Sequence, residues 1–113
     1  MTVARFIHDG GSVDYTPGSD VAAGDVVVQG ELVGISARPI AAGELGALAV
    51  VGVFDLPKAT GADTGIPAGA KVYWDVADGV AKEDDESGAN KLLGKTVADA
   101  ADADAAVAVR LSP

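Results

Sequence analysis

The sequence lacks cysteine and is poor in aromatic side chains, and each shortage excludes a kind of chemistry. Without cysteine the chain has no disulfide, no thiol nucleophile and no cysteine-ligated metal site. Phenylalanine, tyrosine and tryptophan make up 4% of the residues, although hydrophobic residues as a whole make up 49%. The core must therefore consist of small and β-branched side chains, which favours tightly packed strands over a ligand pocket lined by aromatic rings.

Long apolar runs and positive charge are also scarce. No apolar run reaches about 18 residues, and the first residues do not have the pattern of a signal peptide, so no membrane-spanning segment is expected. Eight lysines and arginines stand against 17 acidic residues, which gives a net charge of −9. The cations are scattered along the sequence and predict no basic stripe. Neither nucleic acid nor a membrane surface is therefore an expected partner.

Candidate catalytic groups are few. Histidine occurs once, at His8, so a His-rich metal site cannot form. Residues 89–96 end in Gly-Lys-Thr like a phosphate-binding loop, but Ala89 replaces the first glycine and the four acids at 83–86 precede it. We expect no enzyme, no cofactor and no bound metal. The acidic segment 82–90 predicts a solvated loop; the alternative, a divalent-cation site, lacks the spacing of a calcium-binding loop.

Glycine and proline, in contrast, are frequent, and their positions are typical of β-structure. Fifteen glycines and five prolines divide the chain into about eight short apolar runs. The sequence predicts a hairpin turn at Asp9-Gly10-Gly11 and another at Asp78-Gly79. The runs to which we assign strands are Phe6–His8, Val13–Tyr15, Val26–Val28, Leu32–Ile35, Leu48–Phe54, Lys71–Val76 with Val80, Leu92–Leu93 and Val107–Leu111.

The expected fold class is all-β: a small β-barrel or sandwich in one domain. Residues 1–8 are interpreted as an extended N-terminal arm and residues 9–113 as a single β-rich domain. Residues 96–106 are rich in alanine and aspartate, so they form either one short helix or a turn that leads into the last strand.

A weak internal repeat is visible. Leu32-Val33-Gly34 resembles Leu92-Leu93-Gly94, and each is followed by an alanine-rich turn with an acid and then a strand. Upstream, residues 23–26 resemble residues 68–72. Either the chain holds two copies of one β-unit packed face to face, or its bias toward alanine, glycine and valine produces the likeness.

The order of several short motifs resembles a family of phage capsid cement, or decoration, proteins. The motifs span nearly the whole chain: Ala-Gly-Asp-Val-Val (23–27), Leu-Val-Gly-Ile-Ser (32–36), Val-Gly-Val-Phe-Asp-Leu-Pro-Lys (51–58), Gly-Ala-Lys-Val-Tyr-Trp-Asp (69–75), Leu-Leu-Gly-Lys (92–95) and Val-Ala-Val-Arg-Leu (107–111). Members of this family have sometimes been labelled RecA- or RadA-like recombinases, which the argument against a phosphate loop contradicts here.

The resemblance implies a compact β-tulip fold and a homotrimer that binds the major capsid protein on the outside of the expanded phage head. It further implies a virion protein made in the bacterial cytoplasm. The alternative function is a generic phage-associated binding module, for a tail or a glycan.

Two sets of residues are candidate contact sites. The N-terminal arm has an extended pattern with one cation among apolar neighbours, so we expect capsid contacts from Thr2, Val3, Ala4, Arg5 and Phe6. The alternative is that this segment is the first strand of the domain's own sheet. Tyr73 and Trp74 are candidates for the oligomer interface. Because neighbours on a strand point to opposite faces, one of them should face the core and the other a partner.

Overall fold

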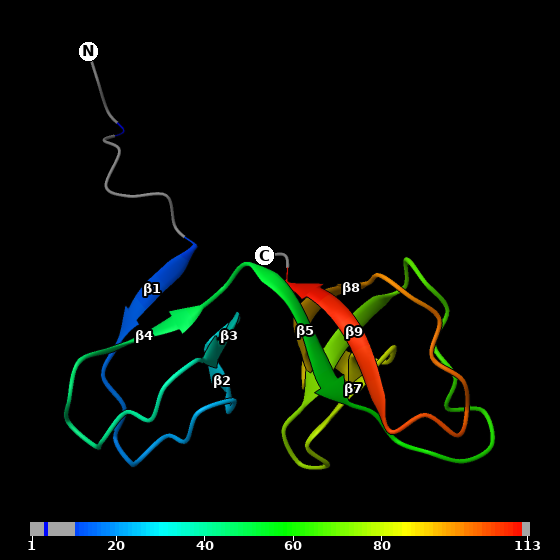
Figure 1. The fold of residues 1–113 in the computed structure, drawn as a ribbon, viewed down its shortest axis with the longest axis horizontal. Coiled ribbons are helices and arrows are strands. Elements are labelled where there is room, and N and C mark those ends of the chain that lie inside the picture. The colour runs from blue at the N-terminus through cyan, green and yellow to red at the C-terminus, as the bar shows by residue number, and fades with distance from the viewer. Residues whose placement is uncertain (1–3, 5–10, 112–113) are drawn as a thin grey trace.

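The described part of the chain consists of two antiparallel β-sheets that lie side by side (Figure 1). The computed structural model describes residue 4 and residues 11–111. The first sheet contains β1 (Ser12–Tyr15), β2 (Val26–Gln29), β3 (Leu32–Ser36) and β4 (Gly46–Ala49). The second contains β5 (Gly52–Pro57), β6 (Lys71–Asp75), β7 (Val80–Lys82), β8 (Lys91–Thr96) and β9 (Ala106–Leu111), with a short 3-10 helix, η1 (Glu86–Gly88), between β7 and β8.

The second sheet curls strongly but does not close. Its strand order is β5-β9-β8-β6-β7, and a single parallel bridge between Lys58 and Ala81 links the end of one edge strand to the other. The all-β class predicted from the sequence is confirmed, whereas a closed barrel is not formed.

Residues 97–105 form a loop, which decides between the two readings of the alanine-rich segment. The aspartate side chains of this loop accept hydrogen bonds from backbone amides. Asp99 binds the amide of Ala68 at 2.7 Å, and Asp102 binds that of Gly65 at 2.6 Å. These bonds hold the loop against residues 65–68. Asp104 also accepts from the nearby amide of Ala101, and a local bond of this kind competes with helix formation, so the helix propensity of alanine does not prevail.

One predicted strand is divided between the two sheets. The run Leu48–Phe54 reads as a single strand, but the chain leaves the first sheet after Ala49 and enters the second at Gly52. Gly52 has φ 130°, a conformation that favours glycine. This connection allows one apolar run to supply a strand to each sheet.

The internal repeat is confirmed by the topology. The first sheet has the order β1-β4-β3-β2, and the second repeats it as β5-β9-β8-β6 before adding β7. The turns match as well: Gly24 and Gly69 both have positive φ, and their amides donate to Ser36 O and Thr96 O respectively. We call residues 12–49 the first unit and residues 52–111 the second unit.

The main hydrophobic core joins the two units. It lies inside the curled second sheet, where Val72, Val109 and Leu93 are almost completely buried. Val33 and Ile35 on β3 belong to the same cluster, and Val26 and Val28 on β2 pack against it. The units are placed next to each other along the long axis, and one face of the first sheet contacts the core of the second.

Candidate functional site

The structure describes only some of the residues that the sequence analysis predicted as contact sites. Thr2, Val3, Arg5 and Phe6 lie outside the described residues, and Ala4 is exposed. Trp74 is buried, 9% exposed, and belongs to the core, whereas Tyr73 faces the opposite side of β6 and is half-buried. Tyr73 is therefore the member of the pair that a second copy can reach.

A row of cations crosses the outer face of the second sheet. Lys71 on β6 is paired with Lys95 on β8, and Lys95 is paired with Arg110 on β9. Directly paired residues of an antiparallel sheet share a face, with Cβ atoms about 5 Å apart, so the three side chains lie within roughly 10 Å. Val53 on β5, 59% exposed, continues the row because it pairs with Arg110. We name Lys71, Lys95 and Arg110 the cation row.

The cation row makes no ion pair with another described residue. All three residues are exposed, on the side of the sheet opposite the buried Val72 and Val109. The salt bridges among residues 11–111 involve Lys82 and Lys91, and none involves the cation row. The absence of a basic stripe, expected from the sequence, was therefore wrong, because strand register brings together cations that are far apart along the chain.

A second charged feature lies at the β6–β7 edge of the same sheet. The ammonium of Lys82 is 2.7 Å from Asp75, 2.8 Å from Asp78 and 3.6 Å from Glu86. The hydrogen bond from Lys82, helped by one from the backbone amide of Asp78, holds the pKa of Asp75 well below its ordinary value of 3.8. The bond to Asp75 likewise raises the pKa of Lys82. This network fastens the segment after β7 to β6.

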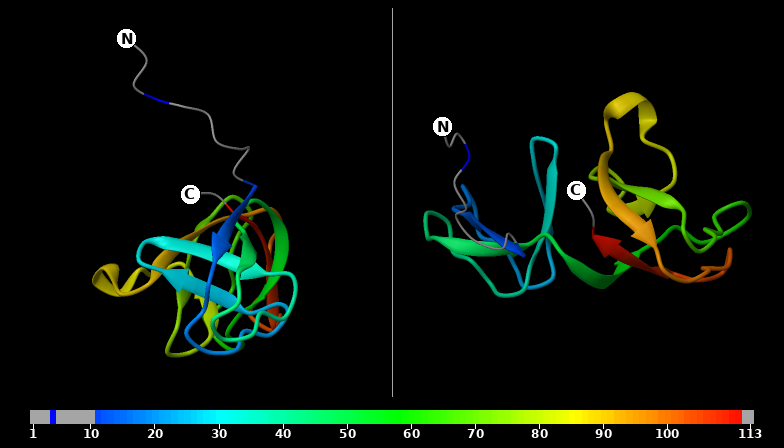
Figure 2. Two further views of the ribbon diagram at one scale, coloured as in Figure 1. Left: turned by 90° about the vertical axis from the view of Figure 1, so that its left-hand side faces the viewer. Right: turned by 90° about the horizontal axis from the view of Figure 1, so that it is seen from above.

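The acidic residues that follow β7 form an exposed projection. We name Glu83, Asp84 and Asp85 the acidic loop; all three are exposed. Figure 2 shows the segment that contains this loop and η1 (yellow) extending beyond the strands in both views. The solvated loop expected from the sequence is present. Asn90 fixes its far end by donating to Asp84 O and to Glu86 Oε2.

The segment that resembles a phosphate-binding loop is a strand. Residues 91–96 are β8, which lies between β6 and β9, and Gly94 is buried in that strand. A phosphate loop requires a turn that opens a helix, so β8 cannot supply the necessary backbone amides. In the described residues no three carboxylate or histidine side chains are placed so that they could hold one metal ion. The helical segment in the same region is too short and too polar to cross a membrane.

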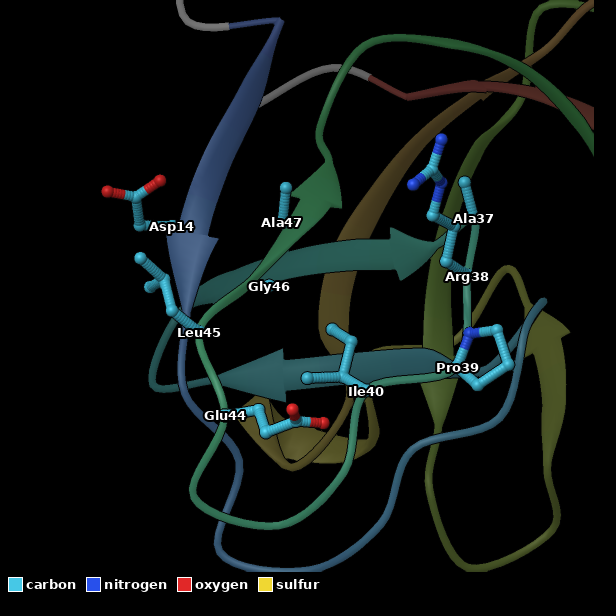
Figure 3. A pocket seen from close by; sticks show the side chains of 9 residues that line it. All are labelled: Asp14, Ala37, Arg38, Pro39, Ile40, Glu44, Leu45, Gly46 and Ala47. Carbon is cyan, nitrogen blue, oxygen red and sulfur yellow. The ribbon is translucent and has the colours of Figure 1, made fainter.

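A cavity of about 590 Å³ opens in the first unit, beside β4 (Figure 3). Leu45, which is 71% exposed, lies at it together with the buried Ile40, and Asp14, Arg38 and Glu44 add charge of both signs. The guanidinium of Arg38 and the carboxylate of Glu44 lie apart, on either side of Ile40 (Figure 3). The charged groups therefore do not converge on a common point, as they would to orient a small ligand.

Sequence reasoning missed the cation row because register is not visible in the sequence. Each cation stands at an outward position of its own strand, next to a buried residue: Val72 follows Lys71, Thr96 follows Lys95, and Leu111 follows Arg110. Alternation of this kind predicts that each side chain points outward. Only the pairing of the three strands places them side by side.

These features describe an all-β, two-unit protein with two exposed charged patches, an architecture typical of structural and interaction proteins. Comparison with protein families makes the assignment specific: the phage cement protein family matches residues 7–111, nearly the whole chain. The chain belongs to this family. Its role is structural, that of a capsid cement or decoration protein. The family match favours this role over the alternative function, a tail- or glycan-binding module. No curated protein and no solved structure matches the chain.

Proposed function

We propose that this protein binds the outer surface of a phage head as a homotrimer and stabilises the expanded shell. The family match over residues 7–111 carries the proposal, since it assigns the whole described domain to capsid cementing. The partner is the major capsid protein of a phage or prophage. Three linked copies bind the shell more tightly than one, because the second and third contacts form at a high effective concentration.

The stabilisation follows from differential binding. A subunit that binds the expanded shell more tightly than the precursor shell shifts the equilibrium toward the expanded form by mass action. This role requires a rigid core and a soluble outer face but no catalysis, and the net charge of −9 keeps free copies dispersed. The protein is accordingly a non-enzymatic virion component, made in the bacterial cytoplasm, that does not bind nucleic acid or membrane.

Co-sedimentation with purified capsids tests the proposal. The protein should bind expanded capsids, should bind precursor capsids much more weakly, and should raise the temperature at which expanded capsids disrupt. Equal binding to both forms, with no change in the disruption temperature, would contradict it.

The N-terminal arm is proposed as an anchor on the shell, through Thr2, Val3, Ala4, Arg5 and Phe6. An extended segment can add to the edge of a capsid sheet, where backbone hydrogen bonds give affinity and an apolar side chain such as Phe6 fills a pocket. The first strand of the described domain is β1. The carbonyl oxygen of Gly11, just before β1, accepts a hydrogen bond from Val50 N, so the proposed arm precedes the residues that pair in the first sheet.

Deletion of residues 2–6 distinguishes a capsid-binding arm from the alternative, in which this segment is the first strand of the domain's own sheet. If the arm is the anchor, the shortened protein folds and self-associates as the full chain does but no longer co-sediments with expanded capsids. Circular dichroism and light scattering serve as the controls for folding and assembly. Normal capsid binding, or failure to fold because the segment belongs to the domain's own sheet, would refute the role of the arm.

A further inference from the structure

The cation row lies on one face of the second sheet, and the repeat identifies the equivalent face of the first sheet. Strand register places Val26, Ile35 and Ala49 at the positions that correspond to Lys71, Lys95 and Arg110, in the same strand order. Ile35 is 4% exposed and lies in the core that the two units share, and Val26 packs against it. This face is therefore the surface by which the first unit packs on the second.

In the second unit the same face has no further unit in the described chain to pack against. The apolar residues of the first unit are replaced there by exposed cations, and like charges directly opposite each other destabilise a sheet. A row of three cations in a chain of net charge −9 is a local arrangement that the fold itself does not require. An anionic partner would remove the repulsion.

We propose that the cation row binds the acidic loop of a second copy of this chain, in a head-to-tail contact that closes the homotrimer. The inference rests on the trimer proposed above and names the surfaces that form it. Two different patches of one molecule that bind each other make a heterologous interface, and such interfaces close into rings when the rotation between copies allows it.

The two patches are complementary in charge and both are free to meet a partner. Neither Glu83 nor Asp85 uses its side chain in a hydrogen bond or ion pair with another described residue, and the loop projects beyond the strands (Figure 2). The Lys82 network holds the base of the loop in one orientation, which reduces the entropy lost on association. Val53 and Tyr73 on the same outer face supply apolar area beside the cations.

A charge-swap experiment tests the contact in the absence of capsids. Lys95→Glu with Arg110→Glu should reduce the mass measured by light scattering from that of a trimer to that of a single chain. Glu83→Lys with Asp85→Lys should do the same, since the two patches again repel. The chain that carries all four substitutions keeps the net charge of −9 and should recover at least half of the trimer.

The matched control restores the net charge of the chain but not the charge complementarity between the cation row and the acidic loop. It combines Lys95→Glu and Arg110→Glu with Asp14→Lys and Glu44→Lys, two exposed acids of the first unit, and should stay a single chain. Recovery of the trimer in this control, or a normal trimer in the first variant, would overturn the proposal. A first variant that assembles normally but no longer binds capsids would also overturn it, because the shell would then be the partner of the cation row.

Cysteine crosslinking extends the test to assembly on capsids. Because the chain has no cysteine, every disulfide in a protein with Lys95→Cys and Glu83→Cys involves these two positions, and the proposed contact brings them within reach between copies. Oxidation, free or on expanded capsids, should yield linked trimers, whereas Asp14→Cys with Lys95→Cys should not. Equal crosslinking of both proteins, or none in the first, refutes the contact. Capsid binding by the unmodified chain is measured separately, so its capsid role can stand even if this contact fails.

Discussion

At the scale of single residues, Gly34 shows how little space the first sheet leaves at its centre. A Cβ atom built on Gly34 would lie 2.8 Å from Leu48 Cβ and 3.3 Å from Ala49 O. Leu48 is fully buried, and neither a Cβ nor a backbone oxygen can move away by a change of rotamer. Overpacking of this kind costs about 1–3 kcal/mol.

We therefore expect Gly34→Ala to lower the free energy of unfolding by about 1–3 kcal/mol. Urea titration followed by circular dichroism measures the change. Gly18→Ala is the control, because a Cβ there meets no atom within 4 Å. Equal stability of the two variants would show that β3 and β4 can separate without loss.

The pH dependence of stability should report on Asp75. Its pKa is lowered in the folded state by the hydrogen bond from Lys82, so folding releases its proton. A carboxyl with a depressed folded pKa stabilises the protein above its ordinary value and loses that contribution as the pH falls below it. The network should thus contribute fully at pH 7 and progressively less below about pH 4.

Thermal melts of Asp75→Asn against the unchanged chain test this expectation. At pH 7 the variant should melt several degrees lower, and the difference should shrink as the pH is lowered toward 3. Asp55→Asn, at an exposed position of β5, is the control and should leave the profile unchanged. A difference in melting temperature that stays constant with pH would mean that Asp75 acts through packing and not through its charge.

At the scale of elements, Lys58 fastens the end of β5 to the loop between β8 and β9. Its side chain is 4% exposed, and its Nζ donates to Ala59 O at 2.6 Å and to Asp104 O at 3.0 Å. The hydroxyl of Thr64 is 3.4 Å away. Lysine is rarely fully buried in proteins, but this cation lies inside the fold, where its ammonium has hydrogen-bond partners.

Replacement of Lys58 by methionine should therefore destabilise the protein. Methionine fills similar space but leaves two part-buried carbonyl groups without this donor, at a cost of about 1–3 kcal/mol. Calorimetry measures the loss, and Arg38→Met, at an exposed site, should change stability by less than about 0.5 kcal/mol. A neutral Lys58→Met would show that water replaces the ammonium.

At the scale of the whole molecule, the shared core predicts that the two units unfold together. Ile35→Ala removes buried side-chain volume from the cluster to which both units contribute, and should cost about 2–5 kcal/mol. The melt should remain a single transition, with calorimetric and van't Hoff enthalpies equal. Leu45→Ala, at a side chain 71% exposed, is the control. Two separate transitions in the Ile35 variant would show that each unit folds alone.

The sequence by itself determined the all-β class, the lack of cysteine chemistry and the exposed acidic loop, and it suggested the repeat that the strand order then confirmed. These properties follow from composition and local pattern: glycine and proline delimit the strands, and valine fills the core between them. The division of the Leu48–Phe54 run between two sheets could not be predicted from the local sequence, because the same apolar run is also compatible with one long strand.

Only the tertiary structure decided which distant residues meet. Lys71, Lys95 and Arg110 form a row because β6, β8 and β9 pair in one register, and that register is set by the burial of Val72, Leu93 and Val109 on the opposite face. Lys58 is buried because the loop that carries Asp104 folds back over the end of β5. Both results depend on contacts between segments far apart in the chain, and local sequence patterns do not encode such contacts.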